Sequence, residues 1–130
     1  MTKVTPFLMF EGKAEVAMKF YVATIPDSRI VAIERYGPDG PGPKGSVVRA
    51  ELLLAGRQIY CSDSYVKHAF SFTPSTSLFV TCADEAEFER ISGALADGGE
   101  WLMPPDDYGF SARFGWLNDR YGVSWQINLN

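Results

Sequence analysis

Residues 77–95 read SLFVTCADEAEFERISGAL, and this stretch contains the clearest secondary-structure signals of the chain. Its first part, 77–82, is short, largely apolar and rich in strand-forming residues, which predicts a buried strand. Asp84 and Glu87 have the spacing of a capping box, which marks the first turn of a helix. Apolar residues then recur at helical spacing and predict the buried side of that helix: Phe88, Ile91 and Leu95.

The same pattern occurs once earlier in the chain. An apolar strand is predicted at 4–10, followed by a helix at 13–22. The buried side of this helix is predicted from its apolar spacing: Ala14, Ala17, Met18 and Tyr21. A shift of about seventy residues places Leu8 on Leu78 and Met18 on Phe88, which indicates an internal repeat.

Each strand–helix pair is followed by three further predicted strands. In the first half they cover 29–36, 47–55 and 57–62, with a loop at 37–45. In the second half they cover 100–103, 111–117 and 123–129, with a break at Pro104-Pro105 and a turn at 118–122. The predicted fold class is α+β, with a β-α-β-β-β order in each half. We expect one domain over 1–130, with module one at about 1–66, module two at about 75–130 and a connector at 63–74.

Composition excludes several classes of function. The 130 residues are 46% hydrophobic and 14% aromatic, the balance of a globular protein with a core. The net charge is −4 and there is no basic run, so no nucleic-acid partner is expected. No segment has the length of a membrane span, so no membrane association is expected. Without a secretion signal, Cys61 and Cys82 are interpreted as reduced thiols of a cytoplasmic protein.

Several stretches resemble one known family. They are PFLMF at 6–10, FY at 20–21, KHAFSFTP at 67–74, SLFV at 77–80 and GWLNDRYGVSWQ at 115–126. Together they are similar to the glyoxalase/bleomycin-resistance (vicinal oxygen chelate) superfamily, and most closely to its PhnB-like branch, often labelled 3-demethylubiquinone methyltransferase. The resemblance implies two βαβββ modules forming a curved mixed sheet around a cup-shaped cavity. It also implies a homodimer.

The resemblance places the usual metal ligands of the superfamily at positions that suit a metal badly in this chain. Those positions are Pro6 or Phe7, Ser77 and Gln126. Pro6 and Phe7 have no side-chain donor, and Ser77 and Gln126 are poor ligands, whereas catalytic zinc needs three strong protein ligands. We therefore expect no metal and no other cofactor, and neither glyoxalase nor dioxygenase chemistry of the metal-dependent kind.

The methyltransferase label of the branch is not supported by a motif. Transfer of a methyl group from S-adenosylmethionine normally uses a nucleotide-binding fold with a glycine-rich turn between strand and helix. No predicted strand is followed by such a turn. A methyltransferase of this type is not expected.

The preferred hypothesis is a metal-independent protein that binds a small, partly aromatic or polar molecule. The candidate contacts are Ser77, Gln126, Trp116, Tyr60 and Ser62. Strand alternation places Ser124 and Asn128 on the face of Gln126, and Trp125 on the opposite face. Aromatic walls with a few polar anchors are what such a cavity needs.

Two other hypotheses stay open at this point. The chain could be an enzyme, for instance a lyase, isomerase or transferase, that uses Cys61, His68 or Asp119 in a non-standard site. Each of these residues also has a structural interpretation: a core thiol, a loop histidine and an aspartate favoured by its turn. Alternatively, the dimer could act as an interaction module without a small ligand.

Overall fold

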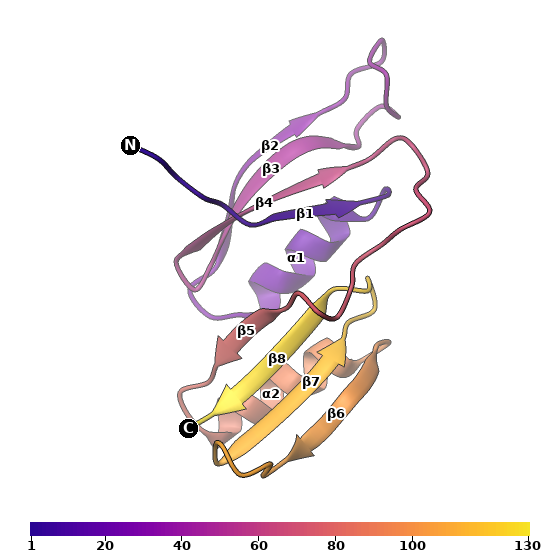
Figure 1. Ribbon diagram of the computed structural model, residues 1–130. Coiled ribbons are helices and arrows are strands. Elements are labelled where there is room, and N and C mark those ends of the chain that lie inside the picture. The colour runs from indigo at the N-terminus through magenta and orange to yellow at the C-terminus, as the bar shows by residue number, and fades with distance from the viewer. The chain divides into compact units, whose positions relative to one another are not determined.

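The computed structural model describes residues 1–130, which divide into two compact units, Met1–His68 and Ala69–Asn130 (Figure 1). We call them unit 1 and unit 2. The division falls inside the predicted connector, and each unit holds one βαβββ half. The repeated β-α-β-β-β order predicted from the sequence is therefore confirmed.

Unit 1 is a four-stranded mixed sheet with one helix on it. Its elements are β1 (Phe7–Phe10), α1 (Ala14–Thr24), β2 (Arg29–Arg35), β3 (Val47–Leu54) and β4 (Arg57–Asp63). The strand order is β1-β4-β3-β2, with β1 parallel to β4 and the other pairs antiparallel. The helix buries the side predicted from its spacing: Ala14, Ala17, Met18 and Tyr21. It ends where Ile25 turns extended before Pro26.

Unit 2 repeats this arrangement. Its elements are β5 (Leu78–Thr81), α2 (Glu85–Ala96), β6 (Glu100–Asp106), β7 (Arg113–Asn118) and β8 (Ser124–Leu129). The strand order is β5-β8-β7-β6, again with a single parallel pair, β5 with β8. The helix buries Phe88, Ile91 and Leu95, as its spacing predicted. The Asp84 carboxylate accepts a hydrogen bond from the Glu87 backbone N–H at 2.9 Å, which confirms the cap.

Most element boundaries agree with the sequence-based prediction to within two residues, and three of the differences have a clear physical reason. The strand predicted to break at Pro104-Pro105 continues through both prolines to Asp106. This is tolerated because β6 lies at the edge of its sheet and its pairing with β7 is irregular there. The first strand begins at Phe7, because Pro6 has no N–H to donate. Asp63, assigned to the connector, is the last residue of β4.

None of the helices is long and apolar enough to cross a membrane.

Candidate functional site

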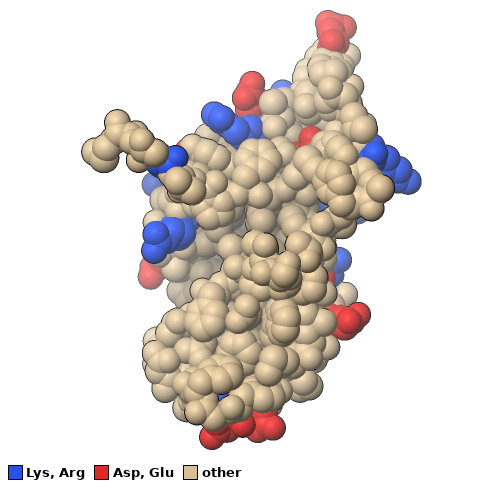
Figure 2. Space-filling view, viewed as in Figure 1, with Lys and Arg blue, Asp and Glu red and all other residues tan.

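In unit 2, one face of the sheet is covered by α2 and the other is not. Trp125, Leu117 and Ile127 lie on the helix side and are almost fully buried. Alternation along the strands places these side chains on the opposite side: Phe79, Phe114, Trp116, Asn118, Ser124, Gln126 and Asn128. We call this side the unit 2 open face. None of these residues is charged, and Figure 2 shows a broad uncharged surface over the same strands.

A chain of hydrogen bonds runs across the unit 2 open face. The Trp116 indole N–H donates to the Ser124 hydroxyl at 2.9 Å. The hydroxyl oxygens of Ser124 and Ser77 lie 2.6 Å apart. The Pro74 carbonyl oxygen is a longer acceptor for both, at 3.5 Å from Ser124 and 3.4 Å from Ser77. When the Ser124 hydroxyl donates to Ser77, the Ser77 hydroxyl has only the long contact to the Pro74 carbonyl as an acceptor for its own proton. It can therefore donate a hydrogen bond to a bound molecule.

Two amide side chains of the same face have unused hydrogen-bonding capacity. Gln126 lies opposite both Trp116 and Phe79 in the strand pairing, is half-buried and has no side-chain hydrogen bond. The Asn118 side-chain oxygen is buried without a partner. An unpaired buried acceptor is unfavourable by about 1–3 kcal/mol. Both amides can therefore gain by meeting a polar partner.

Aromatic rings gather on the same face. Phe114 packs against Phe79 and Phe110 at ring-centroid distances of 6.3 and 4.9 Å, and against Tyr108 at 6.2 Å. Phe79 and Phe110 are 57% and 63% exposed, far more than is usual for large apolar side chains. The unit 2 open face therefore combines polar anchors with an exposed aromatic surface.

In unit 1, Tyr60 and Ser62 lie two positions apart on β4, on the side away from the buried Cys61. The Arg49 guanidinium lies over the Tyr60 ring at 5.1 Å from its centroid. Tyr60 also lines a pocket of about 210 Å³ over β2, β3 and β4. Tyr60 and Ser62 thus share a face in unit 1, while Ser77, Trp116 and Gln126 share one in unit 2.

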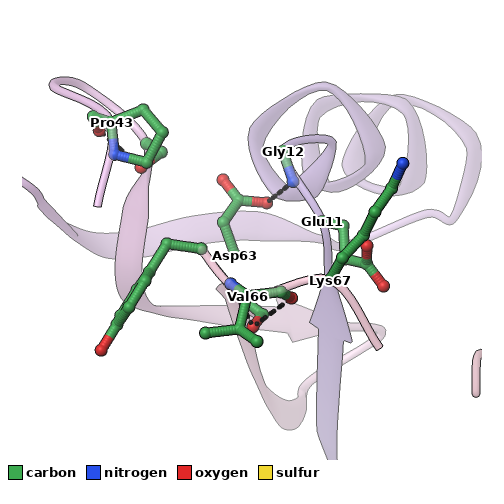
Figure 3. A pocket seen from close by; sticks show the side chains of 9 residues that line it. Glu11, Gly12, Pro43, Asp63, Val66 and Lys67 are labelled. Atoms are coloured by element: carbon green, nitrogen blue, oxygen red, sulfur yellow. Dashed lines mark hydrogen bonds between the residues drawn. The ribbon is translucent and has the colours of Figure 1, made fainter. Parts of the chain in front are cut away.

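A larger hollow of unit 1, about 350 Å³, lies beside the start of α1 (Figure 3). Asp63 points into it from β4, with Glu11 and Lys67 at its border. The Asp63 carboxylate accepts three backbone hydrogen bonds, from Gly12 and Ala14 at 2.9 Å and from Val47 at 3.0 Å. Its acceptors are occupied by the backbone, so Asp63 holds loops together and is a poor candidate for chemistry.

Each of the three candidates for a non-standard catalytic site has a structural setting of its own. Cys61 is fully buried, and burial, with a smaller effect of Asp63, raises the pKa of its thiol to about 12. The His68 ring nitrogen Nε2 is 2.8 Å from the Ser64 hydroxyl. Asp119 is buried in the β7–β8 turn and accepts hydrogen bonds from Tyr121, Val123 and Trp125.

The positions that would hold a superfamily metal do not offer a suitable donor set. Phe7 and Pro6 have no donor atom, the Ser77 hydroxyl is bonded to Ser124, and Gln126 offers one neutral amide. Nowhere in the chain do three or more His, Cys, Asp or Glu side chains gather in a way that could hold a metal ion. These residues do not fit a catalytic metal.

The comparison with known proteins agrees with this architecture. A family model described as 3-demethylubiquinone-9 3-methyltransferase matches residues 2–128. The chain belongs to this family. A PhnB protein from Bacillus cereus is 53% identical, covers 99% of this chain and 100% of its own, and superposes with a TM-score of 0.96. Protein YjdN from Escherichia coli (strain K12) is 24% identical over 139 residues, covering 97% of this chain and 94% of its own.

A structure with little sequence identity to this chain shares its fold. A glyoxylase/bleomycin resistance protein/dioxygenase domain from Frankia sp. EAN1pec shares 14% identity, with a TM-score of 0.70 over 100% of this chain and 98% of that one. The glyoxalase-type fold that the resemblance implied is confirmed. This chain thus combines the glyoxalase-type fold with residues that lack strong donors at the usual ligand positions.

Sequence reasoning did not identify the role of three residues that lie on these faces. Ser124 was placed by alternation, but its central position between Trp116 and Ser77 depends on side-chain geometry. Asn118 was assigned to a turn, although it ends β7. Arg49 gave no signal, because one arginine in a strand is ordinary until its neighbour across the sheet is known.

Proposed function

We propose that this family member is a metal-independent small-molecule-binding protein. The observation that carries the proposal is the unit 2 open face, where Ser77, Trp116 and Gln126 lie together. The chain from Trp116 through Ser124 leaves the Ser77 hydroxyl as a donor, and Gln126 adds an unpaired amide. A few convergent polar groups on an aromatic surface are typical of small-ligand sites.

The contact set extends to Tyr60 and Ser62 of unit 1. Both lie on the face of their sheet that α1 leaves uncovered, and Tyr60 lines a pocket there. We propose that Tyr60 and Ser62 contact a small molecule on this face of unit 1, as Ser77, Gln126 and Trp116 do on the unit 2 open face.

Binding without chemistry is favoured over catalysis by the state of the candidate catalytic groups. With its pKa near 12, the Cys61 thiol is protonated at neutral pH and is a weak nucleophile. Asp119 already uses both carboxylate oxygens to hold its own hairpin. If His68 acted as a base, neither Cys61 nor Asp119 would provide a suitable nucleophile for it to activate.

A methyl transfer from S-adenosylmethionine receives no support from the strand-to-helix turns. The β1–α1 turn has a single glycine, Gly12, and the β5–α2 turn has none. Both sheets are mostly antiparallel, whereas nucleotide-binding folds use mostly parallel sheets. We treat the methyltransferase description as the name of the family and not as its activity.

We further propose a cytoplasmic homodimer. Support comes from the exposed aromatic surface of unit 2, since large exposed apolar patches mark interaction sites. Analytical ultracentrifugation at several protein concentrations tests whether the chain forms a dimer. If a dimer forms but no small molecule binds, the alternative of an interaction module without ligand is favoured.

The binding proposal is tested by a small-molecule screen that uses thermal stabilisation, repeated with and without a chelator. We expect at least one polar aromatic compound to raise the melting temperature in both conditions. Trp116→Phe removes the indole N–H of the hydrogen-bond chain and should weaken the binding of that compound.

Trp101→Phe is the matched control for Trp116→Phe. Trp101 pairs with Leu117 and therefore lies on the helix side of the same sheet. Equal weakening by both variants, or binding that disappears with the chelator, would count against the proposal.

A further inference from the structure

The uncovered face of the unit 1 sheet holds a pocket of about 210 Å³ that is lined by opposite charges. Arg49 lies opposite Glu34 in the β2–β3 pairing, and Glu51 lies opposite Ala32 in β2 and Tyr60 in β4. Residues paired across strands project on the same face, so all five side chains surround one hollow. Ala32 has only a methyl group, which leaves the floor of the hollow open.

Arg49 is held in place but its hydrogen-bond donors are unused. Its guanidinium lies over the Tyr60 ring, a cation–π contact that fixes the plane of the group. No hydrogen bond or ion pair joins the Arg49 guanidinium to another side chain or carbonyl of the chain. A planar guanidinium with free donors matches a carboxylate, which it binds through two parallel hydrogen bonds.

Of the two glutamates that line the pocket, one side chain accepts a hydrogen bond and the other does not. Glu51 accepts a hydrogen bond from the Gln58 amide at 2.6 Å. The Glu34 carboxylate has neither an ion pair nor a hydrogen bond, although Glu34 lies opposite Arg49 in the pairing. Arg49 leans onto Tyr60 instead of pairing with Glu34. The pocket therefore presents one unpaired positive and one unpaired negative group, held apart.

We propose that this pocket binds a small zwitterion carrying a carboxylate and a primary ammonium, a molecule of the amino-acid class. The carboxylate binds Arg49 and the free Tyr60 hydroxyl, and the ammonium binds Glu34. A dianion is disfavoured by the two carboxylates of the pocket, and a simple amine is disfavoured by Arg49. The volume lies below the roughly 300–1,000 Å³ of pockets for drug-sized ligands, which agrees with a small molecule.

This inference rests on the proposed function, because Tyr60 is one of its contact residues, and it adds the class of ligand. The test is an NMR titration of the full chain with glycine, β-alanine and γ-aminobutyrate. Each is compared with the carboxylic acid and the amine of the same chain length. We expect saturable shifts around Glu34 and Arg49 for one of the amino acids. The matching acid and amine should bind roughly tenfold more weakly or worse, because each loses one charge-assisted contact.

Variants separate the pocket from general electrostatic attraction. Arg49→Gln should weaken binding about tenfold or more, since it removes the carboxylate partner. Arg57→Gln is the matched control, because Arg57 is an exposed arginine on β4 with no contact to the pocket. Ala32→Leu should abolish binding by filling the hollow, and it lies on an exposed edge strand where the fold tolerates it. Unchanged amide spectra of the free variants verify folding.

Several outcomes would overturn the inference. The proposal of a zwitterionic ligand is wrong if the carboxylic acid alone binds as tightly as the amino acid. It is also wrong if Arg57→Gln weakens binding as much as Arg49→Gln. If no amino acid binds while a screened compound still binds through Trp116, the inference fails and the proposed function stands. If no compound of either kind binds, both fail.

Discussion

The Asp119 carboxylate is buried and accepts hydrogen bonds on both oxygens within the β7–β8 hairpin. One oxygen accepts from the backbone N–H groups of Tyr121 and Val123, at 2.8 and 3.0 Å, and the other from the Trp125 indole at 2.8 Å. Gly122 supplies the left-handed conformation that closes the same turn, with φ of 89°. Asp119 therefore connects a turn to the core ring beneath it.

Asp119→Ala should destabilise the protein by about 3 kcal/mol, because it leaves several donors without a partner in a buried site. Urea unfolding measures this loss. Asp39→Ala, in the exposed β2–β3 loop, is the control and should change stability by less than about 0.5 kcal/mol. If Asp119→Ala folds with unchanged stability, the structural role is wrong and the residue becomes a candidate for chemistry again.

The buried Cys61 thiol should make the protein less stable in alkali. Burial first, and Asp63 second, raise its pKa from 9.0 to about 12 in the folded state. Between those two values the unfolded chain loses the thiol proton while the folded chain keeps it. Stability should therefore fall as the pH rises above about 9.

Urea unfolding at increasing alkaline pH, with and without Cys61→Ala, measures this contribution. The slope of stability against pH should be shallower in the variant, whatever its absolute stability. Cys82→Ala is the comparison, since the pKa of Cys82 is raised less, to about 11. Identical slopes in Cys61→Ala and the unmodified protein would mean that Cys61 ionises as easily in the folded state as in the unfolded one.

How far a residue's role could be predicted depended on the distance to its partners along the chain. Asp84 was predicted as a cap because its partner, Glu87, lies within the same helical turn. Asp63 was assigned to a connector, since its partners Gly12 and Ala14 are 51 and 49 residues away. Gln126 and Ser77 were chosen from family resemblance, but the hydroxyl that links Ser77 to Trp116 required side-chain geometry.

At the scale of elements, the two helices occupy matching places but begin differently. Helix α2 has the local cap Asp84, whose partner Glu87 also accepts from the Ala83 N–H at 3.1 Å. Helix α1 begins after Lys13, which makes no capping hydrogen bond. Its first N–H group, that of Ala14, donates to Asp63 at the end of β4 instead, and so does the preceding N–H of Gly12. With Leu8 laid over Leu78, the position of Asp63 corresponds to Ile127, which has no acceptor to offer.

This difference predicts unequal effects of two aspartate substitutions. Asp84→Ala should lower stability by about 1 kcal/mol, the usual effect of losing an exposed helix cap. Asp63→Ala should lower it by roughly 3 kcal/mol, because three backbone N–H groups lose their acceptor where water is largely excluded. Thermal unfolding of both variants measures the order. An equal loss, or a larger one in Asp84→Ala, would contradict the assignment of Asp63 as the cap of α1.

The elements themselves were largely predictable because hydrophobic periodicity is a local signal. The helix faces around Met18 and Phe88 and the strands that follow them were recovered. The strand break at Pro104-Pro105 was wrong, since whether a proline interrupts a strand depends on its place in the sheet. That place is a property of tertiary pairing: β6 is an edge strand, and its sequence does not reveal this.

At the scale of the whole molecule, the two units share one strand topology but differ in the side chains on their uncovered faces. Both units have the same strand order relative to their parallel pair, yet their uncovered faces differ. Unit 1 presents Arg49, Glu34 and Glu51, whereas the unit 2 open face presents aromatic and uncharged polar side chains. The two uncovered faces therefore suit ligands of different chemistry.

The donor chemistry of the chain predicts that neither stability nor ligand binding depends on a metal. The positions Phe7, Ser77 and Gln126 lack the imidazole and carboxylate groups that hold zinc, and no other cluster replaces them. Elemental analysis of the purified protein should give well under one metal ion per chain. A strong chelator should leave the melting temperature and the affinity for any screened ligand unchanged.

Variants of the remaining potential ligands complete this test. His68→Ala and Cys61→Ala remove the chain's one histidine and its most deeply buried thiol. Trace metal that persists in both variants is adventitious surface binding. Stoichiometric zinc, nickel or iron, released by the chelator together with a fall in melting temperature, would mean that the protein does hold a metal through weak donors. In that case metal-assisted chemistry would replace simple binding as the function to be explained.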